Sequence, residues 1–535
     1  MCPGAGGQVR YLNGRVPGWP SHVQPKLSTN LSSTTICARV NLLTLTQVCS
    51  REYQENNQPM NEKIRVMKFG GTSVGDAACI KRAAEIVISA ANEGPTVVVV
   101  SAMSGVTNRL IAAANASAKG ETSAAGELAE TLRTQHLAAI EVLAGGADAR
   151  AQLTIEIEKI IDEVAGFCQG TALIRELTPR ALDSISSAGE RLSARLLAQS
   201  IRELDFNAEA VEATELIVTD NTSGRAEPLM PETRQRTKAR LMPLLEARTV
   251  PVVTGFVGAT LEGILTTLGR GGSDYSATIL GAALDAGEVI IWTDVDGVLT
   301  ADPRLVPDAR TLQEISYNEA AELAYFGAKV LHPKTLRPVS EAGIPVWIRN
   351  SFAPERPGTQ ITTTGHPTAR GVKAITAISD VSLITVGGRG IVGLLGVAAR
   401  TFTAAAAAQA NVLLISQSSS ENDICFIINT VDEARTVAEL RRAFAFDIAH
   451  KEVEHINVNP DIAIVAVVGD RMRGVPGIAG RTFSVLGQCG INIIAIAQGS
   501  SEYNVSFVVE AASMRDAVQS LHSEFGLQRP AERIG

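Results

Sequence analysis

Along most of the chain, short apolar runs typical of strands alternate with segments in which apolar residues recur at helical spacing. This pattern predicts strands alternating with helices. Residues 64–69 form a short apolar run before a pair of glycines, residues 77–92 have apolar positions at helical spacing, and residues 96–100 are continuously apolar. Uninterrupted β-branched runs are typical of parallel strands covered on both faces. We therefore expect a βαβ unit at the start of an α/β sandwich with a mainly parallel sheet.

The same pattern predicts the limits of this first domain. Residues 110–200 are rich in Ala, Leu and Glu and indicate helices, whereas strand patterns return at 250–256 and 288–293. Prolines and glycines accumulate after residue 350, which favours a connection without regular structure. We expect a domain over 60–350 and a linker over 351–375.

The remaining sequence repeats itself at an offset of 81 positions. Arg400 recurs as Arg481, Asn411 as Asn492 and Gln417 as Gln498. Each copy has the order strand, helix, strand, strand, helix, with strands expected at 383–386, 412–416 and 424–428 and at their equivalents 464–468, 493–497 and 505–509. The repeat predicts two small α+β domains, over 376–457 and 458–530.

Composition limits the possible partners. The 535 residues are 45% hydrophobic and carry a net charge of −8, so about two to four domains with cores fit, and a basic nucleic-acid-binding surface does not. No run approaches the roughly 18 to 20 apolar residues of a membrane-spanning helix. The seven cysteines are scattered without a CxxC pair, which argues against a disulfide framework or a zinc ribbon. We expect neither a nucleic-acid nor a membrane partner.

The first segment differs from the rest of the chain. Residues 1–51 contain five basic residues and no Asp or Glu, and they show no sustained periodicity. Such a segment resembles an organelle transit peptide, but it lacks a clear amphipathic helix, which favours translation from Met60, directly before the first expected strand. We expect residues 1–59 to be a disordered leader or a misassigned start, and the protein to be cytoplasmic, or plastid if the leader is a transit peptide.

A glycine-rich turn supplies the first candidate site. Lys68, Gly70, Gly71, Thr72 and Ser73 lie between an expected strand and an expected helix. Glycines let backbone N–H groups approach an anion, the helix N-terminus adds positive potential, and the lysine neutralises phosphate oxygens. The alternative is an ordinary turn.

A second turn of the same kind contains Arg270, Ser273 and Asp274 before an Ala- and Leu-rich helix. An arginine on a flexible loop can bind a carboxylate or a phosphate in bidentate fashion, whereas Ser273 and Asp274 could simply cap the helix. Both turns follow the carboxyl ends of strands, where open α/β sheets bind ligands. Polar residues of 101–107 and Glu190 at a helix start are weaker candidates, because a polar turn and a dipole-stabilising residue explain them.

Several motifs in fixed order resemble those of one family. They are KFGGTSVG (68–75), SAMSGVTN (101–108), SSAGER (186–191), GRGGSD (269–274), WTDVDGV (292–298), DPR (302–304) and FGAKVLHP (326–333). From about residue 64 to about 527 the chain resembles an aspartate kinase (aspartokinase), with the amino-acid-kinase αβα sandwich followed by two βαββαβ-like ACT domains. Leu299 departs from the family pattern, which commonly has tyrosine near the nucleotide.

The resemblance implies the reaction and its residues. The reaction would phosphorylate the β-carboxylate of L-aspartate with ATP and Mg²⁺, the first step of lysine, threonine and methionine biosynthesis. Lys68 and Asp274 would be catalytic, His332 would be structural, and no residue set is assigned to a protein-held metal. The implied aspartate-binding residues are Ser101, Thr107, Glu190, Arg270 and Ser273. The implied ATP-binding residues are Lys68, Gly70, Gly71, Thr72, Ser73, Thr293, Asp294, Arg304 and Lys329.

The repeated domains imply regulation by an amino acid. In ACT domains effectors bind between copies, and here the matching positions are Asn411, Gln417, Asn492 and Gln498. The QSSSE and QGSSE sequences resemble threonine-responsive more than lysine-responsive members, so we expect threonine as inhibitor and a homodimer or larger assembly. No homoserine dehydrogenase part follows, which implies a monofunctional enzyme. The alternatives are a kinase of glutamate, acetylglutamate or a nucleoside monophosphate, and an inactive amino-acid sensor.

Overall fold

The computed structural model describes residues 63–328, 331–366, 371–389, 395–417, 423–470, 472, 475–497 and 503–529. The leader expected over 1–59 therefore lies outside the described residues. Within this part of the chain, no helix combines the length and the apolar character needed to cross a bilayer.

The N-terminal part is built on an eight-stranded, mainly parallel sheet with the order β3-β4-β2-β1-β7-β9-β10-β8. Its strands are β1 (Arg65–Phe69), β2 (Thr96–Val100), β3 (Ala208–Val211), β4 (Val250–Thr254), β7 (Glu288–Thr293), β8 (Glu314–Ser316), β9 (Val346–Asn350) and β10 (Thr359–Thr362). A separate hairpin consists of β5 (Val257–Ala259) and β6 (Leu265–Thr267). The five residues of β2 are all buried, as expected for a central parallel strand.

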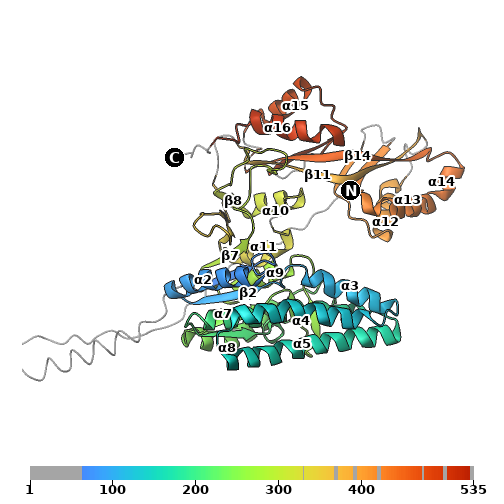
Figure 1. Ribbon diagram of the computed structural model, residues 1–535. Helices are drawn as coiled ribbons and strands as arrows, with labels where there is room; N and C mark the ends of the chain where they lie inside the picture. The colour runs from blue at the N-terminus through green and yellow to red at the C-terminus, as the bar shows by residue number, and fades with distance from the viewer. Residues whose placement is uncertain are drawn as a thin grey trace, which may run out of the picture. The chain divides into compact units, whose positions relative to one another are not determined.

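Helices cover both faces of this sheet. They are α2 (Ala77–Glu93), α3 (Val106–Ala118), α4 (Ala124–Leu143), α5 (Ala147–Ile174), α6 (Pro179–Ser186), α7 (Ala188–Arg202), α8 (Met230–Glu246), α9 (Gly272–Ala283), α10 (Tyr317–Tyr325) and α11 (Pro333–Ala342). Successive residues of β1 point to opposite faces, so Val66 packs in the core with α8, α9 and α11, whereas Met67 packs in the core with α2, α5 and α7. The long helices α4 and α5 lie side by side outside α7 (Figure 1). The expected αβα sandwich is confirmed.

The segment expected as a linker contributes a strand to the sheet. Within 351–375, β10 pairs antiparallel with β9 and parallel with β8, and Ile361 is buried. Of the prolines and glycines that suggested a linker, Pro354, Pro357 and Gly358 lie in the turn between β9 and β10, where Gly358 has a φ of 76°. A strand of only four residues gives too short a pattern to be distinguished from a connection.

The C-terminal part forms one six-stranded antiparallel sheet with the order β12-β13-β11-β14-β16-β15. Its strands are β11 (Ala374–Gly387), β12 (Leu414–Gln417), β13 (Asp423–Asn429), β14 (His455–Val468), β15 (Ala495–Ala497) and β16 (Asn504–Glu510). The helices of this part are α12 (Val397–Ala407), α13 (Glu433–Ala443), α14 (Ala445–Ala449), α15 (Ile478–Gln488) and α16 (Met514–Glu524). The α+β class expected for the repeat is confirmed.

The two repeats exchange halves of their long strands. Ile375 of β11 lies opposite Val467 of β14, and further along Ile384 lies opposite Val458. Ile375 belongs to the core under α15 and α16, whereas Val458 packs against the core under α12 and α13. Figure 1 shows β11 and β14 running side by side between these two helix pairs. The boundary expected at 457/458 therefore falls inside β14, and each repeat is completed by a half-strand from the other.

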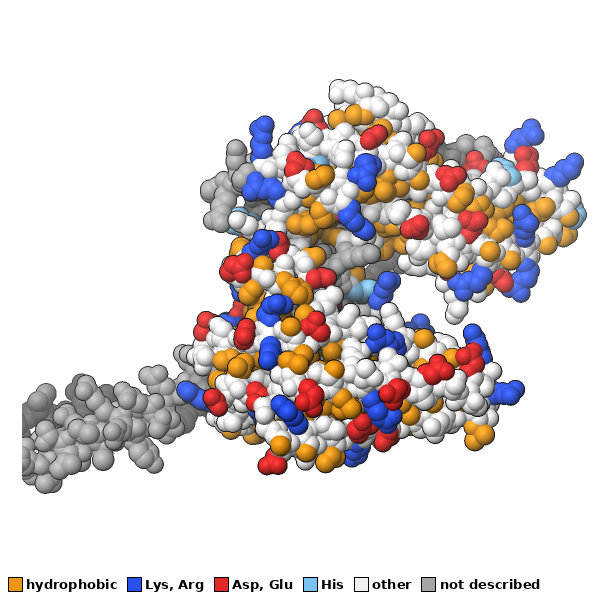
Figure 2. All heavy atoms as spheres, in the orientation of Figure 1, with side chains coloured by type: hydrophobic (Ala, Val, Ile, Leu, Met, Phe, Trp, Pro, Cys, Tyr) orange, Lys and Arg blue, Asp and Glu red, His pale blue; other side chains and the backbone are white. Residues whose placement is uncertain are grey.

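Acidic and basic side chains are interspersed over the face of the molecule shown in Figure 2, with small apolar patches between them. This distribution agrees with the modest net charge of −8. On this face the described residues offer no extended basic surface of the kind that binds a nucleic-acid backbone.

Candidate active site

The two glycine-rich turns, about two hundred residues apart in sequence, meet at the carboxyl ends of β1 and β7. Lys68, near the end of β1, places its Nζ 2.5 Å from Oδ1 of Asp274 in the first turn of α9. Their side chains are only 10% and 17% exposed. Gly70 donates its N–H to the carbonyl of Trp292 at 3.1 Å, which fixes the first turn against β7. The turn thus places a mostly buried lysine at the carboxyl edge of the sheet.

Arg270 lies on the second turn, between two glycines in the left-handed region. Gly269 has a φ of 80° and Gly271 a φ of 70°, conformations that favour glycine. Arg270 is exposed and makes no hydrogen bond or ion pair with another described residue. The helix α9 begins after Gly271 without a side-chain cap, so helix capping does not account for Ser273 or Asp274.

Glu190 is a buried carboxyl group in the first turn of α7, with 4% exposure. Its Oε2 has no hydrogen-bond partner among the described residues. Burial raises the pKa of Glu190 to about 8, although the backbone N–H groups of Ala102 and of Glu190 itself, and the charge of Lys68, act in the opposite direction. The close approach of α7 depends on Gly189, because a Cβ there would lie 2.5 Å from the Cβ of Ala102.

A single cavity of about 810 Å³ brings most of the candidate residues together. The predicted residues that line it are Lys68, Gly70, Gly71, Thr72, Ser101, Thr107, Glu190, Arg270, Ser273, Asp274, Thr293 and Asp294. Cationic Lys68 and Arg270 therefore share one cavity with a buried carboxyl group, one oxygen of which has no hydrogen-bond partner among the described residues. This is the arrangement expected for a ligand that carries both anionic and cationic groups.

Two of the expected ATP-binding residues lie outside the cavity lining, and a third falls outside the described residues. Ser73 is buried behind the turn, where its Oγ donates to the carbonyl of Trp292 at 3.4 Å and receives a hydrogen bond from Ser351. Arg304 lies outside the cavity lining, and its exposed guanidinium is paired with Asp302 at 2.5 Å. Lys329 lies outside the described residues. His332 is the N-cap of α11, in agreement with the structural role expected for it.

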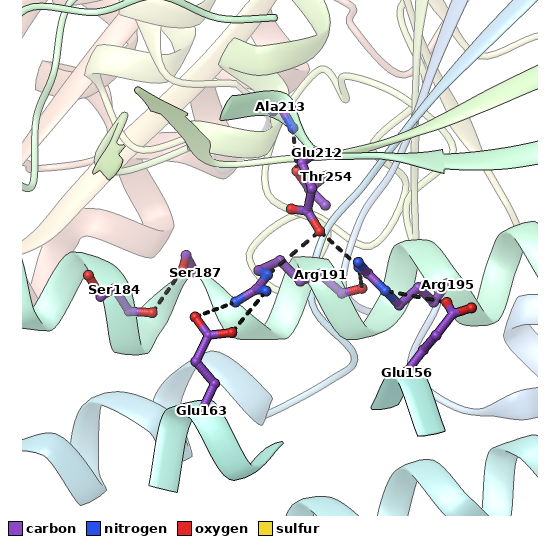
Figure 3. Close-up of polar contacts among 9 residues, drawn as sticks. All are labelled: Glu156, Glu163, Ser184, Ser187, Arg191, Arg195, Glu212, Ala213 and Thr254. Carbon is purple, nitrogen blue, oxygen red and sulfur yellow. Dashed lines mark hydrogen bonds and ion pairs between the residues drawn. The ribbon is translucent and has the colours of Figure 1, made fainter. Parts of the chain in front are cut away.

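An ion-pair network joins α7 to α5 and to Glu212, which follows β3 (Figure 3). Arg191 binds Glu163 of α5 through two hydrogen bonds of 3.1 Å and also pairs with Glu212 at 3.6 Å. Arg195 donates to the same Glu212 at 2.9 Å and pairs with Glu156 at 3.6 Å. Because Arg191 is adjacent to Glu190, this network holds the helix turn that presents the buried carboxyl group.

Sequence reasoning missed a second buried carboxylate at the cavity wall. Asp183 of α6 accepts hydrogen bonds from Thr267 Oγ1 at 2.6 Å and from the N–H of Gly224 at 3.0 Å. It therefore ties α6 to β6 and to the loop before α8. Its only sequence signal is a single acidic residue in a short helix, which is too common to single out.

The expected effector residues lie at the ends of strands in the C-terminal sheet. Gln417 is the last residue of β12 and is exposed, and Asn411 and Asn492 are exposed before β12 and β15. Gln498 lies outside the described residues. These positions follow the repeat, but nothing in the geometry links them to a particular ligand.

Comparisons with known proteins identify both parts of the chain. Residues 63–350 match the model of the amino acid kinase family, and residues 384–444 and 465–525 match that of the ACT domain. Aspartokinase 1, chloroplastic, of Arabidopsis thaliana is 34% identical over 470 residues, which are 86% of this chain and 80% of that relative. The bifunctional aspartokinase/homoserine dehydrogenase 2, chloroplastic, of the same plant is 35% identical over 483 residues, 89% of this chain and 52% of that relative. The chain thus spans about half the length of the bifunctional relatives it matches.

Among solved structures, E. coli aspartokinase III in complex with aspartate and ADP is similar to this chain, with a TM-score of 0.72 and 33% identity. The similarity covers 86% of this chain and 99% of that one. The same E. coli protein in complex with lysine and aspartate matches with a TM-score of 0.72 and 32% identity.

Proposed function

Since this chain belongs to the aspartate kinases of the amino acid kinase family, we propose that it transfers the γ-phosphoryl group of ATP to the β-carboxylate of L-aspartate. The products are 4-phospho-L-aspartate and ADP. The observation that carries the proposal is the meeting of Lys68 and Asp274 in one cavity with Glu190 and Arg270. The E. coli structure with aspartate and ADP bound supports the choice of both substrates.

The acceptor needs positioning rather than deprotonation. A β-carboxylate has a reference pKa of about 3.9 and is ionised at neutral pH, so no general base is required. Phosphoryl transfer spreads negative charge over the oxygens of the transferred group. The Lys68 ammonium and the N–H groups of the Gly70–Gly71 turn offset this charge, while Asp274 holds the lysine in place.

Opposite charges in the cavity select an amino dicarboxylic acid. Glu190, which has an unpartnered Oε2, binds the α-ammonium group of aspartate. Arg270, which has no carboxylate partner of its own, binds the α-carboxylate in bidentate fashion. Ser101, Thr107 and Ser273 add hydroxyl groups at the same wall. The β-carboxylate is thereby directed toward the glycine turn that holds the phosphates.

Magnesium fits this site as a companion of the nucleotide. Mg²⁺ in kinase sites is usually held by one or two carboxylates together with substrate phosphates. Asp294 supplies such a carboxylate at the cavity wall, close in sequence to the Trp292 carbonyl that anchors the glycine turn. When bound, the ion neutralises charge on the β- and γ-phosphates.

The reaction is tested by trapping its product. The full chain is incubated with Mg-ATP and aspartate, glutamate or acetylglutamate, and the acyl phosphate is captured with hydroxylamine. Aspartate-specific hydroxamate is the expected result. A product from glutamate or acetylglutamate instead would identify a different acid kinase, and threonine binding without turnover would identify a sensor.

We further propose that threonine, rather than lysine, inhibits the enzyme through the repeated domains. The support is the likeness of the sequences at Gln417 and Gln498 to those of threonine-responsive members, whereas the E. coli structure in the lysine complex shows that a relative binds lysine. Initial rates measured with each amino acid separate the two. Inhibition by lysine at concentrations where threonine has no effect would overturn the proposal.

A homodimer through the C-terminal sheet is also proposed. The two end strands of this sheet each carry an exposed isoleucine, Ile415 on β12 and Ile496 on β15, with exposures of 52% and 46%. Apolar end strands are favourable docking edges for a second chain. Light scattering after size-exclusion chromatography should give twice the chain mass, and Ile415→Lys should lower it to the monomer value.

The cellular compartment depends on residues 1–59. If translation begins at Met60, or if the leader is retained, the protein is cytoplasmic. If residues 1–59 are a transit peptide that is removed, the protein is in the plastid, as the chloroplastic relatives suggest. Intact-mass measurement of the protein purified from its native source distinguishes a processed N-terminus from an unprocessed one.

A further inference from the structure

A second cavity lies on the α2 face of the sheet, behind the glycine turn. It has a volume of about 480 Å³ and is walled by α2, β1, β7 and β9. This size is within the range of small-ligand pockets, roughly 300 to 1,000 Å³. Trp292 lines it with its side chain, while its carbonyl receives the Gly70 N–H of the active-site turn.

Two guanidinium groups in this cavity are held by aromatic rings rather than by carboxylates. The Cζ of Arg349 lies 4.9 Å from the ring centroid of Trp347 and 6.0 Å from that of Trp292. The Cζ of Arg82 lies 4.9 Å from the ring centroid of Phe352. Neither arginine makes a hydrogen bond or an ion pair with another described residue.

The third arginine of the cavity provides a contrast. Arg65 donates to Glu288 at 2.7 Å and to Glu93 at 3.2 Å, so its charge is already compensated. Of the remaining charged groups that line the cavity, Arg82 and Arg349 are positive and Glu85 is negative. Together the lining has three arginines and three glutamates, so its net charge is zero, and what distinguishes Arg82 and Arg349 is that neither is paired with a carboxylate among the described residues.

Stacking leaves the donors of a guanidinium group available. The ring occupies the face of the group, whereas the N–H bonds lie in its plane and can bind two oxygens at once. In addition, the indole Nε1 of Trp292 and the Nε of Arg349 are buried without an acceptor among the described residues. Buried donors usually have an acceptor. The lack of one for these two N–H groups therefore also points to a ligand that accepts hydrogen bonds.

We propose that this cavity binds a small dianionic oxyanion, such as a phosphate monoester or a dicarboxylate, between Arg82 of α2 and Arg349 of β9. The site is separate from the active-site cavity and does not depend on the reaction proposed above. Its wall residue Trp292 connects it to the glycine turn.

Tryptophan fluorescence provides a direct test. The chain has three tryptophans, Trp19, Trp292 and Trp347, so in a Trp19→Phe protein all emission comes from the two residues stacked on Arg349. Inorganic phosphate and succinate are the probes, titrated at constant ionic strength with NaCl as the balancing salt. We expect a saturable change in emission and a matching heat of binding by calorimetry.

Four variants test whether the fluorescence and heat changes come from binding in this cavity. Arg349→Gln and Arg82→Gln should each weaken binding at least about tenfold, as expected for loss of a charge-assisted bidentate contact. Arg337→Gln is the matched control, because Arg337 is exposed and pairs with Glu341 on α11. Lys68→Ala should leave the response intact, since Lys68 lies in the other cavity. Circular dichroism shows whether each variant is folded. If Arg349→Gln does not fold, Arg82→Gln on α2 still tests the site.

Three results would overturn the proposal. They are the absence of a saturable response to either probe, an equal response to NaCl alone, and a response that Lys68→Ala removes but Arg349→Gln and Arg82→Gln do not. A response to both probes supports a general dianion site, and a response to phosphate alone or succinate alone supports the same site with that ligand chemistry.

Discussion

At the scale of single residues, the pair of Lys68 and Asp274 has the largest expected effect on activity. Lys68→Ala should lower kcat by about a thousandfold, because a preorganised donor to the transferred group is lost. Steady-state rates give this value, and threonine binding should be unchanged. Lys238→Ala is the control, since Lys238 is a surface residue paired with Asp285. Near-normal activity of Lys68→Ala would remove the catalytic assignment.

The raised pKa of Glu190 predicts that the activity with aspartate depends on pH. Its pKa of about 8 means that the carboxyl group of the free enzyme is mostly protonated at neutral pH, whereas the ammonium group of aspartate requires the carboxylate. The value of kcat/KM for aspartate should therefore rise up to about tenfold per pH unit from about pH 6, and level off above about pH 8. Glu190→Gln should have a lower kcat/KM without this rise. An unchanged profile in Glu190→Gln would assign the dependence to another group.

At the scale of elements, α16 of the second repeat holds the segment that follows β7. Arg515 donates to the carbonyl of Arg304 at 3.0 Å, Gln519 donates to that of Leu305 at 2.7 Å, and His522 Nε2 lies 2.9 Å from Thr300 Oγ1. The segment begins at Thr293 and Asp294, which line the active-site cavity. A regulatory helix is thus in direct contact with a segment that leads to the expected ATP site.

Loss of these contacts should affect ATP more than aspartate. Arg515→Ala and Gln519→Ala should each raise the KM for ATP about fivefold, the equivalent of about 1 kcal/mol for a hydrogen bond. The KM for aspartate should change less, because Glu190 and Arg270 lie on other elements. Asp516→Ala, on the exposed side of the same helix, is the control. Equal changes in both KM values would indicate a general loss of structure instead.

At the scale of the whole molecule, a buried ion pair joins the catalytic and regulatory parts. Lys373, just before β11, donates to Glu319 of α10 at 2.7 Å, and the two side chains are 3% and 0% exposed. Lys373→Met should destabilise the protein by about 3 to 5 kcal/mol, because an unpaired carboxyl group remains buried. Thermal unfolding measures the effect, and Glu319→Gln in the same chain should restore part of it.

A surface ion pair gives the matched comparison. Arg337 and Glu341 on α11 are 74% and 68% exposed, so Arg337→Met should change stability by no more than about 0.5 kcal/mol. If Lys373→Met were equally mild, the junction would not contribute to the stability of the fold.

The parts that could be predicted from sequence are those in which neighbouring residues carry the whole signal. The strands at 96–100 and 288–293 have the bounds expected for them, because each contains an uninterrupted apolar run, at 97–100 and 289–292. The helix expected to follow Ser273 and Asp274 already begins at Gly272, so these two residues line the cavity from its first turn. The expected strands at 383–386 and 464–468 are only C-terminal parts of β11 and β14, which have 14 residues each.

The sequence by itself determined the order of strands and helices, the repeat and the family, because periodicity, glycine turns and ordered motifs are local properties of the chain. Only the tertiary structure decided that β11 and β14 exchange halves, that Asp183 lies at the cavity wall, and that Arg349 stacks on two tryptophans. These features depend on which distant segments pack together. Backbone pairing and side-chain burial between such segments leave no periodic trace in either partner alone, and this is the physical reason that they had to be seen in three dimensions.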